Sequence, residues 1–460
     1  MITLGFHGAA RTVTGSKYLL TSGTDQLLVD CGQFQGLKHL RLKNWEAPPF
    51  KASGLKWVAL THTHIDHCGY LPRLVKEGFQ GPVFCTPPTV DLLKIVLMDA
   101  AKLQMEDADR HNRMGTSAHK PALPLFDKDD VERTLTLVQA VEYGTQRKLS
   151  DKLSIRFIDV GHILGSAMIQ ATAFDEGKTR RILFSGDVGR YNMPLPPDPS
   201  APPDSDYLVV ESTYGNRKHD IADPKEELFR VVEKVVKNKG ILLVPAFAVG
   251  RSQQILFMLR ELANAKRIPL LPVHLDSPMA HATTQVYLKY MSNSKINMDA
   301  LKGGGSIIGQ NVTLHKTAQD SRRLEGLKGP AVVIASSGML AGGRILNHLR
   351  NFMPLPTTVL AIAGYQAEGT RGRALLEGKK VIRVYGEEVQ IRGEVVDLDG
   401  FSGHADCDEL MRWTGGLSKA PVKVFVTHGE EPQAVAFAER LKKERGWDAA
   451  VPAMNEVATL

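Results

Sequence analysis

One short stretch decides the fold of this chain: Thr61-His62-Thr63-His64-Ile65-Asp66-His67-Cys68-Gly69. The apolar run before it, Trp57-Val58-Ala59-Leu60, indicates a short buried strand, and the residues from Gly69 onward begin a pattern typical of a helix. We therefore expect the stretch to be a loop that leads from a strand into a helix. Three imidazoles and a carboxylate are crowded into that loop, which is the pattern of a metal site.

The side chains of this loop are expected to serve two metal centres. Alternate side chains of an extended chain share a face, so His62, His64 and Asp66 are expected to converge while His67 turns toward a second centre. Imidazole nitrogen and carboxylate oxygen suit zinc, and they also accept manganese or iron. No Cys-x-x-Cys pair exists among the four cysteines, which argues against a sulfur-ligated metal and fits a reducing compartment: Cys31, Cys68, Cys85 and Cys407.

Further candidate ligands stand where other predicted strands end. A strand expected over residues 154–160 precedes His162, a strand expected over 181–185 precedes Asp187, and His428 lies in the strand–loop–helix pattern near the end of the sequence. Two ions that share a water need about seven protein ligands, and such a pair, about 3.5–4 Å apart, activates the water for an in-line displacement. The expected chemistry is therefore hydrolysis. We expect one ion on His62, His64 and His162, the other on Asp66, His67 and His428, and Asp187 between them.

A histidine after a strand is more often a satisfied polar group than a ligand, so the argument rests on the complete set. The remaining histidines that we considered lack such partners in the sequence. We interpret them as structural: His7, His39, His274, His281, His315 and His348.

The pattern of the chain changes twice, and 460 residues are too many for one core. Residues 1–206 are rich in strands and end in a proline-dense segment that can form neither a helix nor a central strand. From 207 to 380 helices alternate with apolar strands, which predicts a parallel sheet covered by helices. Residues 381–460 return to the strand–loop–helix pattern. We expect the domain boundaries at these changes.

The composition is that of a globular enzyme, with 43% hydrophobic residues and mixed charge. No run approaches the roughly 20 apolar residues that span a bilayer, and the first residues look like a strand rather than a signal peptide. We therefore expect a cytoplasmic protein with no membrane partner. The formal net charge of +7 favours an anionic partner.

Three further motifs accompany the histidine loop: Glu211-Ser212-Thr213-Tyr214-Gly215, Gly400-Phe401-Ser402-Gly403-His404-Ala405-Asp406 and Thr427-His428-Gly429-Glu430. Together with the loop, Asp30, His162 and Asp187, they resemble the signature of the metallo-β-lactamase fold and of its β-CASP branch. That branch consists of nucleic-acid-processing nucleases, among them the endonuclease subunit of the pre-mRNA cleavage complex and its bacterial relatives. The resemblance covers nearly the whole chain, since residues 244–251, 336–339 and 364–372 look like the domain that is inserted in this branch.

The resemblance implies an α/β architecture. Residues 1–206 and 381–460 would form a metallo-β-lactamase αββα sandwich, and residues 207–380 would form the inserted β-CASP domain. The resemblance also implies an active site in the cleft between the two.

The resemblance further implies a dinuclear zinc endoribonuclease. A metal-bridging hydroxide would attack phosphorus, with Asp187 bridging the two zinc ions, for which manganese or iron are alternatives. Glu211 would hold His404, and His404 would protonate the leaving ribose oxygen. The products would carry a 5′-phosphate and a 3′-hydroxyl. Asp30 would support a ligand histidine from behind the site.

The substrate implied by the resemblance is single-stranded RNA, because a histidine at the position of His428 accompanies RNA substrates in this branch. Four residues are candidates for phosphate contacts and are equally interpretable as turn or helix-end residues: Arg251, Ser337, Thr370 and Arg371. The sequence leaves the oligomeric state open, including a homodimer.

Three alternatives accompany the endoribonuclease hypothesis. The first is a 5′-to-3′ exoribonuclease of the RNase J type; such proteins typically carry an additional C-terminal domain, for which we expect no room after His428. The second is a hydrolase of a small thioester or lactam, which explains the metal ligands but not Glu211 or His404. The third is an RNA-binding scaffold without catalysis, which predicts missing ligands.

Overall fold

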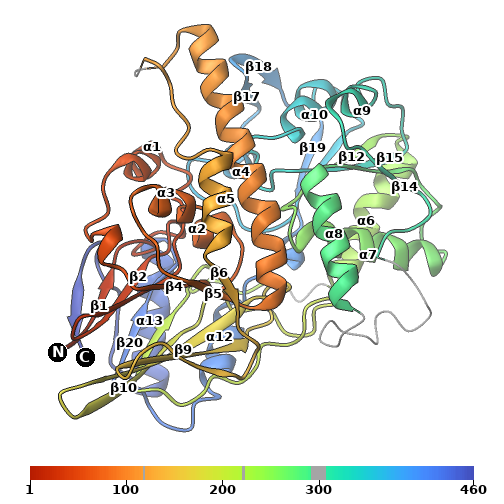
Figure 1. Ribbon diagram of the computed structural model, residues 1–460. Coiled ribbons are helices and arrows are strands. Elements are labelled where there is room, and N and C mark those ends of the chain that lie inside the picture. Colours follow the sequence, from red (N-terminus) through yellow and green to blue (C-terminus); the bar gives the residue numbers. More distant parts are fainter. Residues whose placement is uncertain (118–119, 220–222, 292–306) are drawn as a thin grey trace. The chain divides into compact units, whose positions relative to one another are not determined.

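The computed structural model describes residues 1–117, 120–219, 223–291 and 307–460, and the chain divides into two compact units (Figure 1). Unit 1 combines Met1–Lys218 with His404–Leu460, and unit 2 comprises His219–Gly403. Unit 2 is therefore inserted into a unit that is built from two separate segments of the chain. Within the described residues, no helix has both the length and the apolarity needed to cross a bilayer.

Unit 1 contains two seven-stranded sheets. The first has the order β22-β1-β2-β3-β4-β5-β6 and consists of Val457–Thr459 (β22), Ile2–Phe6 (β1), Tyr18–Ser22 (β2), Asp25–Val29 (β3), Trp57–Ala59 (β4), Val83–Cys85 (β5) and Val138–Ala140 (β6). The second has the order β21-β20-β11-β10-β9-β8-β7 and consists of Ala449–Ala450 (β21), Lys423–Val426 (β20), Tyr207–Val210 (β11), Lys178–Phe184 (β10), Ala167–Asp175 (β9), Leu153–Asp159 (β8) and Gln146–Lys148 (β7).

The two sheets of unit 1 share one apolar core. Strand β8 shows why: Leu153, Ile155 and Phe157 alternate with polar residues, and all three are buried. They belong to the same core cluster as Leu4 and Phe6 of β1 in the other sheet. The apolar faces of the two sheets are therefore packed against each other.

Helices lie on the outer sides of these sheets. Helix α5 (Lys128–Thr136) contacts both α3 (Leu71–Lys76) and α4 (Pro87–Met114), and α4 contacts β6. Trp413 of α12 (Cys407–Thr414) and Phe437 of α13 (Glu431–Arg445) pack on the second sheet. The expected αββα sandwich is thereby confirmed. The helices of unit 1 are Lys38–Leu42 (α1), Ile65–Cys68 (α2), Leu71–Lys76 (α3), Pro87–Met114 (α4), Lys128–Thr136 (α5), Cys407–Thr414 (α12) and Glu431–Arg445 (α13), with short 3-10 turns at Lys43–Trp45 and Ala52–Gly54.

Unit 2 is built on a six-stranded parallel sheet with the order β14-β13-β15-β12-β16-β19. The strands are Val312–Leu314 (β14), Val273–Asp276 (β13), Ala331–Ala335 (β15), Ile241–Pro245 (β12), Val359–Ile362 (β16) and Glu394–Asp397 (β19), and the hairpin Val381–Val384 (β17) with Glu387–Gln390 (β18) stands beside them. The helices are Pro224–Lys237 (α6), Arg251–Asn264 (α7), Pro278–Met291 (α8), Ala318–Arg322 (α9), Ile345–Phe352 (α10) and Arg371–Leu376 (α11), with a 3-10 turn at Asp399–Phe401.

The central strands of unit 2 are buried along their whole length, as the continuous apolar runs in the sequence predict for a parallel sheet. Helices α6 and α10 both contact β12, so the sheet is covered by helices. Leu349 and Phe352 of α10, Leu243 of β12 and Ile382 of β17 lie in one core cluster. The predicted parallel sheet of the inserted domain is therefore confirmed.

The limits of the two units differ from the expected domain boundaries at 206/207 and 380/381. Strand β11 pairs with β10 and β20, which keeps residues 207–210 in unit 1. Strand β19 pairs with β16, which keeps residues 394–397 in unit 2. Strand pairing between distant segments therefore moves both limits toward the carboxyl terminus, and a change of sequence pattern does not reveal such pairing.

The topology of unit 1 places the carboxyl ends of several strands at a common edge. Strand β3 runs parallel to β4, and β10 runs parallel to β11 and β11 to β20. Strand β8 is antiparallel to β9, and β9 is antiparallel to β10, so β8 also runs in the direction of β10. The candidate site residues and segments that begin within three residues of these ends are Asp30, Thr61–Cys68, His162, Asp187, Glu211 and His428.

Candidate metal centre

The histidine loop (residues 61–69) connects β4 to α2 and α3, as the sequence predicts. Its extended part ends at His64, the N-cap of α2, so Asp66 lies in the first turn of this helix, directly before His67. The expectation that Asp66 shares a face with His62 and His64 along an extended chain is therefore wrong. A helical turn replaces the alternation of a strand and places the carboxylate of Asp66 3.5 Å from Nε2 of His428 instead.

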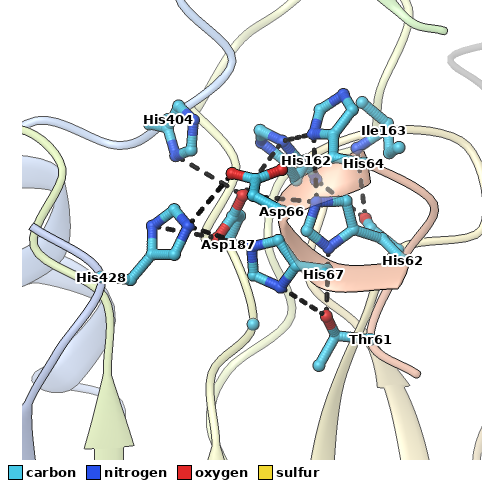
Figure 2. Close-up of polar contacts among 12 residues, drawn as sticks. Thr61, His62, His64, Asp66, His67, His162, Ile163, Asp187, His404 and His428 are labelled. Carbon is cyan, nitrogen blue, oxygen red and sulfur yellow. Dashed lines mark hydrogen bonds and ion pairs between the residues drawn. The ribbon is translucent and has the colours of Figure 1, made fainter. Parts of the chain in front are cut away.

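The first group of ligand atoms comes from His62, His64, His162 and Asp187. Nδ1 of His64 lies 3.0 Å from Nε2 of His62 and 3.2 Å from Nε2 of His162. Figure 2 shows these three rings turned toward one another from the histidine loop and from the loop after β8. Three imidazole nitrogens thus converge on one point.

The second group consists of Asp66, His67 and His428. Nε2 of His67 and Nε2 of His428 are 3.0 Å apart. Residue His428 has a left-handed backbone, with φ of +47°, and its N–H donates to the carbonyl of Ala9 (2.7 Å). This hydrogen bond helps to hold a conformation that is uncommon for a residue other than glycine.

Asp187 lies between the two groups, with one oxygen toward each (Figure 2). Its Oδ2 is 3.3 Å from Nε2 of His62 and 3.6 Å from Nε2 of His162. Its Oδ1 is 3.2 Å from Nε2 of His67 and 3.5 Å from Nδ1 of His428. Asp187 is thus placed as a bridging ligand would be.

The donor set fits divalent metal ions. Asp187 is buried, yet neither of its oxygens makes a hydrogen bond of normal geometry among the described residues. Burial lowers the pKa of His62, His64 and His162, that of His64 to about 3, which favours the neutral form that binds metals. Burial would raise the pKa of Asp187, but the surrounding imidazoles outweigh it and hold this pKa well below its ordinary value. Converging lone pairs around a buried carboxylate are what a cation would satisfy.

Asp30 contacts a ligand histidine on the side away from the other ligands, as expected from the sequence. Its Oδ2 lies 2.8 Å from Nδ1 of His67, and its Oδ1 accepts from the N–H of Thr61 (2.8 Å). Burial would lower the pKa of His67, but the charges of Asp187 and Asp30 outweigh it and raise this pKa well above its ordinary value. The contact with Asp30 fixes the orientation of the His67 ring and leaves Nε2 facing His428.

Two threonines that the sequence analysis did not single out contact ligand residues. The hydroxyl of Thr61 lies 3.0 Å from Nδ1 of the ligand residue His62, and it also bonds both oxygens of Asp30 (2.9 and 3.1 Å). The hydroxyl of Thr213 lies 3.2 Å from Nδ1 of His428. Both threonines adjoin predicted functional residues, Thr61 directly before His62 and Thr213 two residues after Glu211. That adjacency is the only signal in the sequence that could have revealed them.

Glu211 and His404 form a third cluster with Asp187. Oε1 of Glu211 accepts from the N–H of Val188 (2.7 Å) and lies 3.1 Å from Nδ1 of His404, while Oε2 accepts from the N–H of Thr213 (3.1 Å). Because an ionised carboxylate only accepts, the hydrogen of this contact is on Nδ1 of His404. Burial would lower the pKa of His404, but Glu211 and Asp187 outweigh it and raise this pKa.

The four candidate phosphate contacts all lie in unit 2: Arg251, Ser337, Thr370 and Arg371. Thr370 is the N-cap of α11, and its hydroxyl accepts from the N–H of Arg373 (3.3 Å). Arg371 donates to the carbonyls of Arg383 (2.8 Å) and Leu340 (3.1 Å). These two residues thus have the turn and helix-end contacts of the alternative interpretation, and an RNA contact by any of the four stays a prediction.

The fold and the site together define a class: a metal-dependent hydrolase whose ligands stand on loops at strand ends of an αββα sandwich. Comparison with known families agrees with this class. Residues 11–145 match the metallo-beta-lactamase superfamily, residues 252–375 match the Beta-Casp domain, and residues 388–452 match the Zn-dependent metallo-hydrolase RNA specificity domain.

The chain belongs to the β-CASP family of RNA-processing nucleases of the metallo-β-lactamase fold, as its relatives show. It is 38% identical to ribonuclease TTHA0252 of Thermus thermophilus, over 94% of each chain. It is 31% identical to an RNase J-like protein of Methanocaldococcus jannaschii, over 96% of each chain. It is 29% identical to transcription termination factor FttA of the same archaeon, over 96% of this chain and 69% of that protein.

Similarity to a solved structure supports the fold of this chain but not its activity. The crystal structure of a protein of unknown function from Enterococcus faecalis V583 superposes over 100% of both chains with a TM-score of 0.55. The sequence identity between the two is 13%, so this likeness carries no statement about activity.

Proposed function

We propose that this chain is a dinuclear zinc endoribonuclease that cleaves single-stranded RNA and leaves 5′-phosphate and 3′-hydroxyl ends. The observation that carries the proposal is the position of Asp187, which faces both histidine groups and lies 3.9 Å from Nδ1 of His404. The two groups of candidate metal ligands and the proposed general acid His404 thus all lie next to the carboxylate of Asp187. Membership of a family of RNA-processing nucleases supports the choice of RNA as the substrate.

The ligand residues divide into two sets around Asp187. We assign one ion to His62, His64 and His162 and the other to Asp66, His67 and His428, with Asp187 shared. When bound, two zinc ions would neutralise the scissile phosphate and lower the pKa of a shared water; manganese or iron would serve the same purpose. All of these side chains except His64 and Asp66 are buried, so the two positions are shielded from bulk solvent.

His404 is assigned as the general acid. Glu211 accepts from Nδ1 of His404 and is itself fixed by two backbone N–H groups, so the ring cannot rotate freely. Nε2 is then the atom that would deliver a proton to the leaving 3′-oxygen of the ribose. Because the protein supplies both the acid and the metal ligands, the 2′-hydroxyl of RNA has no chemical part, and a 3′-hydroxyl product is expected.

Two other functions would use the same ligands. An exonuclease would also need Glu211 and His404, and the similarity to an RNase J-like protein keeps that mode as an outcome of the test. A hydrolase of small thioesters or lactams would have no leaving ribose oxygen for His404 to protonate.

The test is cleavage of a 5′-labelled single-stranded RNA, beside DNA of the same sequence, by the wild-type protein and by His404→Ala. The proposal predicts internal RNA cuts with 5′-phosphate and 3′-hydroxyl ends, which disappear with chelator and in the variant, while DNA stays intact. Release of the label as the 5′-terminal nucleotide, without internal fragments, would show 5′-to-3′ exonuclease action. An absence of cleavage by folded, metal-loaded protein would reject the proposal.

A further inference from the structure

The motif that carries Glu211 continues into an arginine that the function described so far does not use. Arg217 is exposed, and its guanidinium carbon lies 4.3 Å from the ring centroid of Tyr214. The ring of Tyr214 is buried, and its centroid is 6.3 Å from that of His404. Arg217 and the proposed general acid thus both lie close to the ring of Tyr214.

The backbone holds Arg217 firmly in this position. Its N–H donates to the carbonyl of Tyr214 (3.2 Å), and its own carbonyl accepts from the N–H of Cys407 (3.2 Å). Tyr214 also forms a parallel bridge with Asp406, two residues after His404. The segments that carry Glu211 and His404 thus hold the main chain of Arg217 between them.

The guanidinium itself is available to a ligand. No ion pair of Arg217 with a carboxylate exists within the described ranges, whereas Lys218 beside it pairs with Asp408. A guanidinium that lies on an aromatic face keeps its N–H edges free, and these edges match the oxygens of a phosphate. Stacking also reduces the rotamer freedom that Arg217 would lose on binding.

We propose that Arg217 binds the RNA phosphate immediately upstream of the scissile phosphate. The placement rests on the proposed function, in which His404 protonates the 3′-oxygen of the upstream nucleotide. A cation that shares the Tyr214 ring with His404 and lies outside the metal groups would be close to the strand that leaves with this oxygen. Arg217 is thus a substrate-binding residue that holds the leaving strand, and it takes no part in proton transfer.

The chain offers a matched control for this arginine. Arg147 of β7 is also exposed, and its guanidinium carbon lies 5.4 Å from the ring centroid of Phe84, which is buried. Arg147→Ala removes the same charge and the same kind of stacking, but on the edge strand of the second sheet and away from the ligand loops.

The first measurement is RNA affinity by fluorescence anisotropy, with metal-loaded full-length protein in the cleavage-deficient His404→Ala background. Arg217→Ala is expected to weaken binding about 10-fold and to reduce the slope of log affinity against log salt by about 0.7, the value for one phosphate of a single strand. Arg217→Lys should recover the slope and part of the affinity, because charge remains and the planar fork is lost. Equal binding by Arg217→Ala and Arg147→Ala would overturn the proposal.

The second measurement places the phosphate, in the wild-type His404 background, with an RNA whose cut has been mapped. A neutral methylphosphonate directly upstream of the cut should lower kcat/KM of the wild-type protein about 10-fold and have no further effect in Arg217→Ala. A methylphosphonate downstream should lower both proteins alike. Additive losses at the upstream position would overturn the proposal. Cleavage by His404→Ala would instead refute the general acid of the proposed function, which keeps the two failures apart.

Discussion

Unit 1 and unit 2 each bury an aspartate among histidines, but the two aspartates have opposite surroundings. In unit 2, Asp276 accepts from Arg344 (2.7 Å) and Ser321 (2.5 Å) and lies 2.7 Å from Nε2 of His348. In unit 1, the oxygens of Asp187 face imidazole nitrogens at 3.2–3.6 Å without a normal hydrogen bond among the described residues. The aspartate of unit 2 is satisfied by protein groups, whereas the aspartate of unit 1 is arranged for a cation.

Histidines and aspartates that lie close together are therefore only weak evidence for a metal site. His274 and His315 also lie close together in unit 2, with Nδ1 3.0 Å from Nε2. Nevertheless, within the described ranges the groups whose atoms could hold a metal all belong to unit 1. What separates the two clusters is the hydrogen bonding of the carboxylate, because a saturated aspartate has no lone pair directed at a common point.

The largest effect is expected on the rate of RNA cleavage, which should depend on a histidine of unit 1 but not on a histidine of unit 2. His404→Ala should lower kcat for RNA cleavage roughly 10²–10⁴-fold, because a general acid is removed. His348→Ala, which removes a buried histidine of unit 2, should leave kcat within about 2-fold of wild type at temperatures below unfolding. Single-turnover cleavage of labelled RNA measures both. Equal losses of kcat in folded His404→Ala and His348→Ala would remove the distinction between the clusters.

The next largest effect is expected on the stability of unit 2 and tests whether the carboxylate of Asp276 has a structural role. Asp276→Asn should destabilise unit 2 by roughly 3 kcal/mol at pH 7, the lower end of the range for a buried pair, because the partly buried Arg344 would lose its counter-charge. Hydrogen exchange of the amides in β13 and α10 measures this locally. Asp151→Asn, which alters an exposed ion pair with Lys148, is the control and should leave exchange unchanged.

The same variant should show a defined pH dependence. Burial would raise the pKa of Asp276, but hydrogen bonds from His348, Ser321 and Arg344 outweigh it and lower this pKa below its ordinary value of 3.8. The stabilisation by Asp276 is therefore complete above pH 3.8 and is lost as the pH falls through the lower pKa of the folded state. The stability difference between wild type and Asp276→Asn should shrink in that range. A difference that grows on acidification would contradict the assignment.

A smaller effect is expected behind the metal centre. Asp30→Asn should weaken metal affinity roughly 10–100-fold, because the contact that orients His67 loses its charge. Competition with a chelator measures the affinity. Asp25→Asn, at the start of the strand that Asp30 follows, alters the contacts of a buried carboxylate with Lys56 and Ser150, outside the metal centre, and should retain the wild-type affinity. Equal affinities in all three proteins would show that Asp30 is not a supporting residue.

The smallest effect is expected at Thr213. Thr213→Val removes the hydroxyl that contacts Nδ1 of His428 and should weaken metal binding by about 10-fold or less. Thr213→Ser keeps the hydroxyl and should restore the affinity. A loss of the same size in the serine variant would indicate that packing of the methyl group, and not orientation of the ring, is responsible.

Much of unit 1 was predictable because its functional residues follow short apolar strands. A strand that delivers a histidine or an acid at its end predicts both the element and the position of the side chain, as for His162 and Asp187. The sequence also suggested two sets of ligands, and the structure brings the side chains together in the same two sets around Asp187. The position of Asp66 was mistaken, because an apolar pattern does not reveal that a helix begins at Ile65 directly after a ligand.

The features that the sequence did not predict depend on contacts between distant segments. The limits of unit 2 depend on which strand β11 and β19 pair with, and the partners of β11 are more than 20 residues away in one case and more than 200 in the other. The contact of Thr213 with His428 and the stacking of Arg217 on Tyr214 depend on side-chain directions. Such details require tertiary structure, since many sequences with the same local pattern would lack them.

The number of metal ions bound per chain shows most directly whether Asp187, and not Asp276, is arranged for cations; it is measured by elemental analysis of protein purified with zinc. We expect about two ions in the wild-type protein, fewer in Asp187→Asn, and about two in Asp276→Asn. A wild-type protein that binds none, or an Asp276→Asn variant that loses metal while Asp187→Asn retains it, would contradict the distinction between the two clusters.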